Sequence, residues 1–135
     1  MKPNGITQTL AKRPGGPSWN IESVGANNRA WESKSFELPA HQELAVSGWA
    51  VDSESKKAAG GVEMVIDGAP YAAQYGGERP DVATFFGRPE CADSGYVMKL
   101  PAGQFAAGSH AMFVRVLSSD RKSYWEVGPY TLNVK

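Results

Sequence analysis

Apolar and polar residues alternate with a period of two along most of the chain after Trp19. Between Leu44 and Val51, for example, Leu44, Val46 and Ala50 fall on one face of an extended chain. This alternation is typical of β-strands, because successive side chains of a strand point to opposite faces of a sheet. The pattern predicts short strands at residues 20–25, 36–38, 44–51, 62–67, 71–75, 96–100, 112–117, 123–127 and 130–134.

Turn-forming residues between these runs support the prediction of strands. The dipeptide Asp67-Gly68 separates two alternating runs. It favours a tight hairpin, because glycine tolerates the positive φ that such turns need. Residues 118–122 fit a longer hairpin loop, and Gly103 and Gly108 bracket another loop. Many short strands separated by frequent turns indicate an all-β fold, namely an antiparallel two-sheet sandwich.

One segment departs from the alternation. Val82, Phe85 and Phe86 recur at the spacing i, i+3, i+4, which gathers them on one side of a helix. Pro80 suits the first turn of a helix, and Gly87 suits its end. We therefore expect one short helix over residues 80–86, docked by its two phenylalanine rings over an open end of the sheets.

The first 18 residues differ in composition from the rest of the chain. They contain three glycines, three prolines and three basic residues, but no acidic residue and few large apolar ones. Such a composition is typical of a flexible tail or linker. The sequence therefore predicts a tail at residues 1–18 and a single β-sandwich domain at residues 19–135.

Charge and cysteine content narrow the range of partners. Lys plus Arg and Asp plus Glu both number 14, so the formal net charge is zero. A general nucleic-acid or anionic-membrane binder needs a basic excess, so the sequence predicts neither partner. Cys91 is the single cysteine, which excludes an intrachain disulfide and a cysteine-rich zinc site. No apolar run is long enough to span a membrane, and the N-terminus lacks the apolar stretch of a signal peptide.

A series of short motifs occurs in a fixed order and resembles a known family. The motifs are Gly48–Asp52, Val65–Gly68, Tyr75-Gly76, Arg79–Val82, Ser94–Tyr96, Gly108–His110 and Val114–Val116. The series, over roughly residues 44–135, resembles an immunoglobulin-like β-sandwich module of bacterial proteins. That module is appended to secreted enzymes, surface proteins or the extracytoplasmic ends of membrane proteins, including some membrane glycosyltransferases. The resemblance implies an immunoglobulin-like sandwich and an accessory role outside the cytoplasm, without catalytic residues. It carries over no binding residues.

Seven motif residues are predicted to have structural roles: Trp49, Asp52, Asp67, Gly68, Arg79, Asp81 and His110. We expect Trp49 to cover the second face of its sheet, with Gly48 leaving space beside it; the alternative is a sugar-stacking platform. Arg79 is expected to pair with Asp52 or to cap the end of the sandwich. If that pair is buried, loss of Arg79 would cost roughly 3–5 kcal/mol of stability.

The remaining motif residues fit turns and element ends. Asp67 suits its hairpin turn, and Asp81 suits a first helical turn, where a negative charge meets the helix dipole. His110 is expected to cap a loop at the start of a strand. The acidic residues match no calcium-loop spacing, so the sequence predicts no metal site.

Three aromatic residues are the least explained by packing in a core. Trp31 lies in a polar stretch, and Tyr124-Trp125 follows a polar hairpin loop. Exposed tryptophan and tyrosine rings can stack on sugars or anchor protein contacts. Trp31, Tyr124 and Trp125 are therefore candidate ligand-binding residues, whereas the alternative is that Trp125 packs inward and Trp31 covers the sandwich edge.

The leading interpretation is a non-catalytic accessory module of a larger, extracytoplasmic bacterial protein, periplasmic or secreted, acting as a spacer or binding a glycan or protein partner. One alternative is a carbohydrate-binding module. Another is the C-terminal extracytoplasmic domain of a membrane glycosyltransferase. The chain contains no nucleophile or zinc motif such as G-x-S-x-G or H-E-x-x-H. We therefore expect no catalytic residues and no cofactor.

Overall fold

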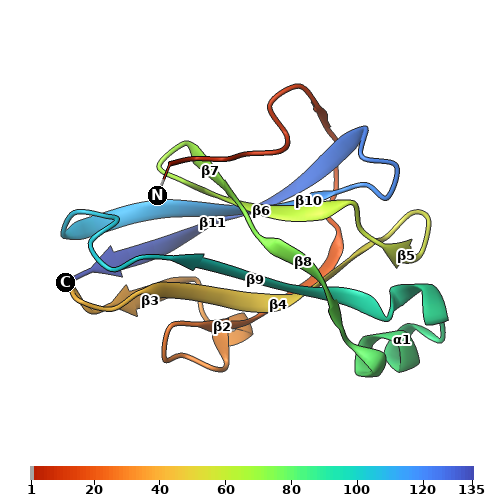
Figure 1. The fold of residues 1–135 in the computed structure, drawn as a ribbon, viewed down its shortest axis with the longest axis horizontal. Coiled ribbons are helices and arrows are strands. Elements are labelled where there is room, and N and C mark those ends of the chain that lie inside the picture. Colours follow the sequence, from red (N-terminus) through yellow and green to blue (C-terminus); the bar gives the residue numbers. More distant parts are fainter. Residues whose placement is uncertain (1) are drawn as a thin grey trace.

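The computed structural model describes residues 2–135, whose strands form two sheets that pack face to face (Figure 1). The first sheet has the strand order β2-β4-β9-β8, with the short β5 beside β4. Its strands are β2 (Ser18–Val24), β4 (Leu44–Asp52), β5 (Lys57–Ala58), β8 (Gln74–Glu78) and β9 (Asp93–Leu100).

The second sheet has the order β1-β11-β10-β6-β7, and β3 also pairs with β11. Its strands are β1 (Ala11–Lys12), β3 (Ser35–Leu38), β6 (Gly61–Ile66), β7 (Ala69–Ala72), β10 (Gly108–Leu117) and β11 (Ser123–Val134). The orders β2-β4-β9-β8 and β11-β10-β6 correspond to the A-B-E-D and G-F-C sheets of immunoglobulin domains. The predicted all-β, immunoglobulin-like sandwich is therefore confirmed.

The pairings within the sheets are antiparallel except at one edge. Both β1 and β3 run parallel to β11. Sequence alternation identifies a strand but not its partner, so these two parallel pairings at the edge of an otherwise antiparallel sandwich were not predicted. As a result, the edge of β11 that faces away from β10 is paired with β1 near the beginning of β11 and with β3 near its end.

Inward-facing residues of the two sheets build the core, and Tyr96 is the largest fully buried side chain in it. Its hydroxyl donates a hydrogen bond to the carbonyl oxygen of Asn20 at 2.9 Å. A Cβ atom on Gly48 would lie 2.0 Å from that oxygen and 2.7 Å from the Tyr96 hydroxyl. Gly48 therefore makes room for Tyr96 on the inner face, rather than for Trp49 as the sequence suggested.

Two of the predicted strand boundaries are wrong. The run at residues 71–75 contains parts of two strands in different sheets, because the chain crosses from β7 to β8 at Ala73. The runs at 123–127 and 130–134 belong to the single strand β11, whose register with β10 shifts between Met112 and Val114. The alternation of apolar and polar residues continues where the chain crosses between sheets, so it did not reveal the end of β7. It is interrupted by the irregularity within β11, so one strand was predicted as two.

The helix lies at its predicted position. Helix α1 (Pro80–Phe86) ends at Gly87, which has the left-handed φ of 64°. Val82 is buried and Phe86 packs against Trp49, but Phe85 is 76% exposed. The prediction that both phenylalanines dock is thus wrong for Phe85, because Val82 and Phe86 are one turn apart and already occupy the sheet-facing side.

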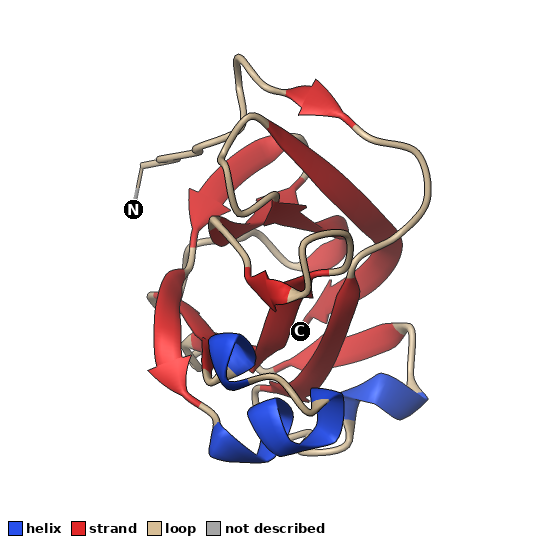
Figure 2. Cartoon of the chain, turned by 90° about the vertical axis from the view of Figure 1, so that its right-hand side faces the viewer, coloured by secondary structure: helices blue, strands red, loops and turns tan. Residues whose placement is uncertain are grey.

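The short 3₁₀ helix η2 (Pro89–Cys91) contacts α1, and η1 (Ala30–Glu32) contacts β2; Figure 2 shows the helical segments in blue. None of the helices between residues 2 and 135 is long and apolar enough to cross a membrane.

Residues 4–13 of the predicted tail lie against the second sheet. The Asn4 amide donates to the Pro70 carbonyl oxygen at 2.9 Å, and β1 pairs with the start of β11. Thr7 is 3% exposed and donates a hydrogen bond to the carboxylate of Glu63, which is itself fully buried. Met1, also part of the predicted tail, lies outside the described residues. The segment therefore covers part of the sandwich surface.

Candidate functional site

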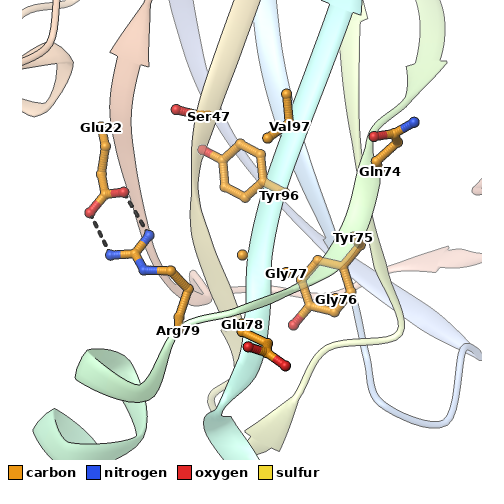
Figure 3. Close-up of a pocket in the computed structure, with 11 residues that line it drawn as sticks. Glu22, Ser47, Gln74, Tyr75, Gly76, Gly77, Glu78, Arg79, Tyr96 and Val97 are labelled. Carbon is orange, nitrogen blue, oxygen red and sulfur yellow. Dashed lines mark hydrogen bonds and ion pairs between the residues drawn. The ribbon is translucent and has the colours of Figure 1, made fainter.

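A groove crosses the outer face of the β2-β4-β9-β8 sheet. Its larger hollow, of about 470 Å³, lies over β8 and β9 and is shown in Figure 3. A smaller hollow of about 260 Å³ lies between this sheet and α1, where Trp49, Val82 and Phe85 line it. Glu22 and Arg79 line both hollows, so the two adjoin. We refer to the two hollows together as the Arg79 groove.

Strand alternation points the groove residues outward. Glu22 follows the buried Ile21 on β2, and Ser47 lies between the buried Val46 and Gly48 on β4. The same alternation on β9 leaves Val97 38% exposed. These residues therefore form the solvent side of strands whose other side builds the core.

Arg79 is held by carboxylates on both sides. Its guanidinium donates to Glu22 at 2.7 and 2.9 Å, and to Asp81 at 3.0 and 2.8 Å. The hydrogen bonds to Asp81, followed by those to Glu22, raise the pKa of Arg79, and Arg79 in turn lowers the pKa of Asp81. The result is a fixed charged cluster on the surface of the sheet, drawn in part in Figure 3.

Asp52 is not the partner of Arg79, so that predicted pairing is wrong. Its carboxylate accepts hydrogen bonds from the backbone amides of Glu54 and Ser55, both at 2.9 Å, and of Ser119 at 2.7 Å. Burial of Asp52 would raise its pKa, but these hydrogen bonds outweigh burial and lower it. Asp52 therefore ties the turn after β4 to the loop between β10 and β11.

Aromatic rings form one wall of the Arg79 groove. Trp49 is half-buried and meets Phe86 edge to face, with 5.6 Å between the ring centroids. Phe85 meets Phe86 at 5.1 Å but leaves most of its own ring in solvent. Trp49 thus covers the second face of its sheet, as the sequence predicts, and it also lines a hollow.

Glycines lie at the floor of the groove. Gly77 on β8 and Gly95 on β9 are paired in register. A Cβ atom on Gly95 would lie 3.2 Å from Cγ of Arg79, so this glycine lets the arginine stem cross close to the sheet. Glycine in a strand often marks the close approach of another group to the backbone.

The structure does not gather the three predicted ligand-binding aromatics into one open surface. Tyr124 is 9% exposed and Trp125 is 3% exposed. The guanidinium carbon of Arg115 lies 4.8 Å from the Tyr124 ring centroid, and that of Arg13 lies 4.6 Å from the Trp125 ring centroid. A stacking platform needs open ring faces, so their burial does not fit that role; Trp31, on η1, is half exposed.

The Asp67-Gly68 turn joins β6 to β7 as predicted, and Asp67 and Gly68 both have positive φ. The Asp67 carboxylate lies 2.5 Å from Nδ1 of His110, whose Nε2 lies 2.7 Å from the carbonyl oxygen of Ala106. Both ring nitrogens of His110 therefore face acceptors, and the Asp67 hydrogen bond leads the contacts that raise the pKa of His110.

Cys91 is buried at the end of the sandwich, where its thiol contacts the carbonyl oxygen of Lys56 at 3.5 Å. Burial raises the pKa of Cys91, so the thiol is held in its protonated, weakly nucleophilic form. Within residues 2–135, no three His, Cys, Asp or Glu side chains cluster closely enough to hold a metal ion.

The sequence did not identify Glu22 or Phe85 as groove residues. The pairing of Glu22 with Arg79 joins residues 57 positions apart, which local patterns cannot reveal. A signal was available for Phe85, since a helix of seven residues buries few positions and Val82 and Phe86 already fill one side of it.

Comparison with protein-family models gives no match, and comparison with curated protein sequences gives none either. Among solved structures, the chain is similar to the X-ray structure of the endo-β-1,4-mannanase from Thermotoga petrophila, with a TM-score of 0.52 and 10% sequence identity. The match covers 91% of this chain but 20% of the mannanase chain. At this identity the likeness shows the fold alone, which is that of a β-sandwich.

Proposed function

We propose that this chain is a non-catalytic accessory module, acting as a spacer or binding a partner, in a larger extracytoplasmic bacterial protein. The observation that carries the proposal is the coverage of the structural match. Nearly all of this chain corresponds to a fifth of a larger enzyme, as an appended module would. The bacterial and extracytoplasmic parts of the proposal rest on the motif series from Gly48 to Val116.

The charged groups of the groove favour binding over catalysis. A general acid must hold a proton near neutral pH. Arg79 lowers the pKa of Asp81, which keeps this carboxylate ionised. Arg79 is itself engaged by two carboxylates. Asp81 and Arg79 are therefore better suited to hold a ligand by hydrogen bonds than to act as general acids.

An immunoblot of fractionated cells tests the accessory role. Antiserum raised against the purified chain should detect a protein much larger than this chain, in the periplasmic, secreted or membrane fraction. Detection in the membrane fraction of a product that also transfers sugars would favour the glycosyltransferase alternative. A cytoplasmic product of the size of this chain alone would overturn the proposal.

Carbohydrate binding is the second candidate function. The similar structure is that of an enzyme named for a β-1,4-linked polysaccharide, and the outer sheet face of this chain carries a groove with aromatic and hydrogen-bonding side chains. Titration of the chain with soluble glycans, followed by NMR amide shifts, tests this function. An unchanged spectrum at millimolar glycan would overturn it and leave the spacer role.

A further inference from the structure

We propose that the Arg79 groove binds a neutral, extended polysaccharide chain. Phe85 and Trp49 would stack against sugar rings, while the Glu22–Arg79–Asp81 cluster would hold the hydroxyl groups. This inference rests on carbohydrate binding, the second candidate function above. It places the binding site in the Arg79 groove rather than at Trp31, Tyr124 and Trp125, the residues that the sequence suggested.

The first argument is the exposure of Phe85. It has the highest exposure of the large apolar side chains of residues 2–135, at 76%, although the next residue, Phe86, turns its ring toward Trp49 on the sheet. Trp49 lines the same hollow, so two aromatic rings border it. Sugar rings have apolar C–H faces, and aromatic faces offer them a matching surface while ring-edge hydroxyls remain free.

The second argument is the unused hydrogen-bonding capacity of the carboxylates. Each carboxylate oxygen can accept about two hydrogen bonds. Arg79 donates one hydrogen bond to each oxygen of Glu22 and one to each oxygen of Asp81. The guanidinium holds both carboxylates in place, so their remaining lone pairs can accept hydrogen bonds from sugar hydroxyl groups at little cost in side-chain entropy.

The third argument concerns the charge of the ligand. Glu22, Glu78 and Asp81 line the groove, whereas Arg79 supplies its positive charge. The excess of carboxylates disfavours an acidic polymer such as a polyuronate, because like charges repel. A neutral polysaccharide meets no such penalty.

The fourth argument concerns the length of the ligand. The two hollows share Glu22 and Arg79, so a molecule that crosses this shared wall contacts both. On the β8 side, a Cβ atom on Gly76 would meet nothing within 4 Å, so the bare backbone leaves space there. An extended chain of sugars can occupy both hollows, whereas a single sugar occupies one.

The experiment titrates the full chain with mannohexaose and cellohexaose as neutral probes and with an oligogalacturonate as the acidic probe. Amide shifts are followed by NMR and affinities by calorimetry. We expect saturable binding of at least one neutral probe, with shifts centred on Glu22, Gly77 and Phe85. Phe85→Ala should weaken this binding by roughly 3- to 10-fold, and Trp31→Ala, which removes a half-exposed ring outside the groove, should leave it unchanged.

Each other outcome overturns the inference in a distinct way. If the wild type binds a probe and Phe85→Ala binds it equally well, carbohydrate binding stands but this groove is rejected. Amide shifts centred on Trp31 would have the same meaning. A preference for the acidic probe would reject the neutral ligand. No binding by wild type would reject both the groove and the carbohydrate candidate, and cleavage of a probe, seen by chromatography of the same samples, would reject the non-catalytic role.

Discussion

His110 lies between two hydrogen-bond acceptors, the Asp67 carboxylate and the Ala106 carbonyl oxygen. A neutral imidazole has a single N–H and can satisfy one of them, whereas the imidazolium satisfies both. The folded protein therefore favours the protonated ring, which is why the pKa of His110 is raised. Because the pKa is higher in the folded state, the stability that this pair contributes is present below about pH 6.5 and is lost as pH rises through the folded pKa.

We expect an NMR titration to place the pKa of His110 above about 6.5, and Asp67→Asn to lower it. Asparagine tolerates the positive φ of 52° at this position, so the turn should be retained. Denaturant unfolding should show that Asp67→Asn loses more stability at pH 5.5 than at pH 9. A loss independent of pH would contradict the proton-linked contribution.

Arg79 is held by two carboxylates but is not deeply buried. Its side chain is 23% exposed, that of Glu22 is 33% exposed and that of Asp81 is 64% exposed. Solvent screens such pairs, so the cost of losing Arg79 should fall well below the cost that the sequence suggested for a buried pair.

Thermal unfolding of Arg79→Ala should therefore show a Tm lowered by about 3–6 °C. Arg79→Lys should recover only part of this loss, because an ammonium group cannot bind two carboxylates in the bidentate geometry of a guanidinium. Asp81→Asn, which leaves the Glu22 pair intact, serves as the milder control. An unchanged Tm for Arg79→Ala would show that the cluster serves a ligand alone.

At the scale of elements, the N-terminal segment is joined to the second sheet by a buried polar network. Glu63 on β6 accepts hydrogen bonds from the Ile6 amide, at 2.9 Å, and from the Thr7 hydroxyl. Thr7 also accepts one from Arg115 at 2.9 Å, and Arg115 binds Glu126 at 2.7 Å. Thr7 thus bridges a buried carboxylate and a guanidinium, which a detached tail would not do.

Thr7→Val keeps the shape of this side chain but removes its hydroxyl, leaving Glu63 with one donor fewer in a buried position. We expect the variant to lose about 2 kcal/mol of unfolding free energy in urea, with Thr7→Ser, which retains the hydroxyl, as the matched control. Deletion of residues 1–13 should also lower the Tm. Wild-type stability in both Thr7→Val and the deletion variant would show that the segment behaves as a free tail.

For the whole molecule, sequence alternation located the strands that bury one face and expose the other, such as β4, β9 and β10. The sequence also predicted α1, because Pro80 favours the first turn of a helix and Gly87 favours its end. It could not assign partners, so the parallel pairing of β3 and the sheet crossing at Ala73 were missed. Which strands pair depends on which segments, often distant in the sequence, bury apolar surface together. A short stretch of sequence does not contain that information.

The candidate site was less accessible from the sequence than the fold. Trp49 was identified as a possible platform, but Glu22 was not singled out, because its proximity to Arg79 depends on the register of β2, β4 and β9. The polar loop before Tyr124 makes this residue a candidate for an exposed, ligand-binding ring. In the fold Tyr124 is buried, and Arg115 on the neighbouring strand lies across its ring.

The pairing of β11 at both ends also affects how copies of the molecule meet. An open strand edge is a template on which further chains can stack and aggregate. Here β1 pairs with residues 123–124 and β3 with residues 131–134, while the pairing of β8 with β9 is interrupted by register shifts around Gly77. Irregular edges of this kind are poor templates. The β11 and β8 edges are therefore poor sites for a second copy of the chain to add a strand.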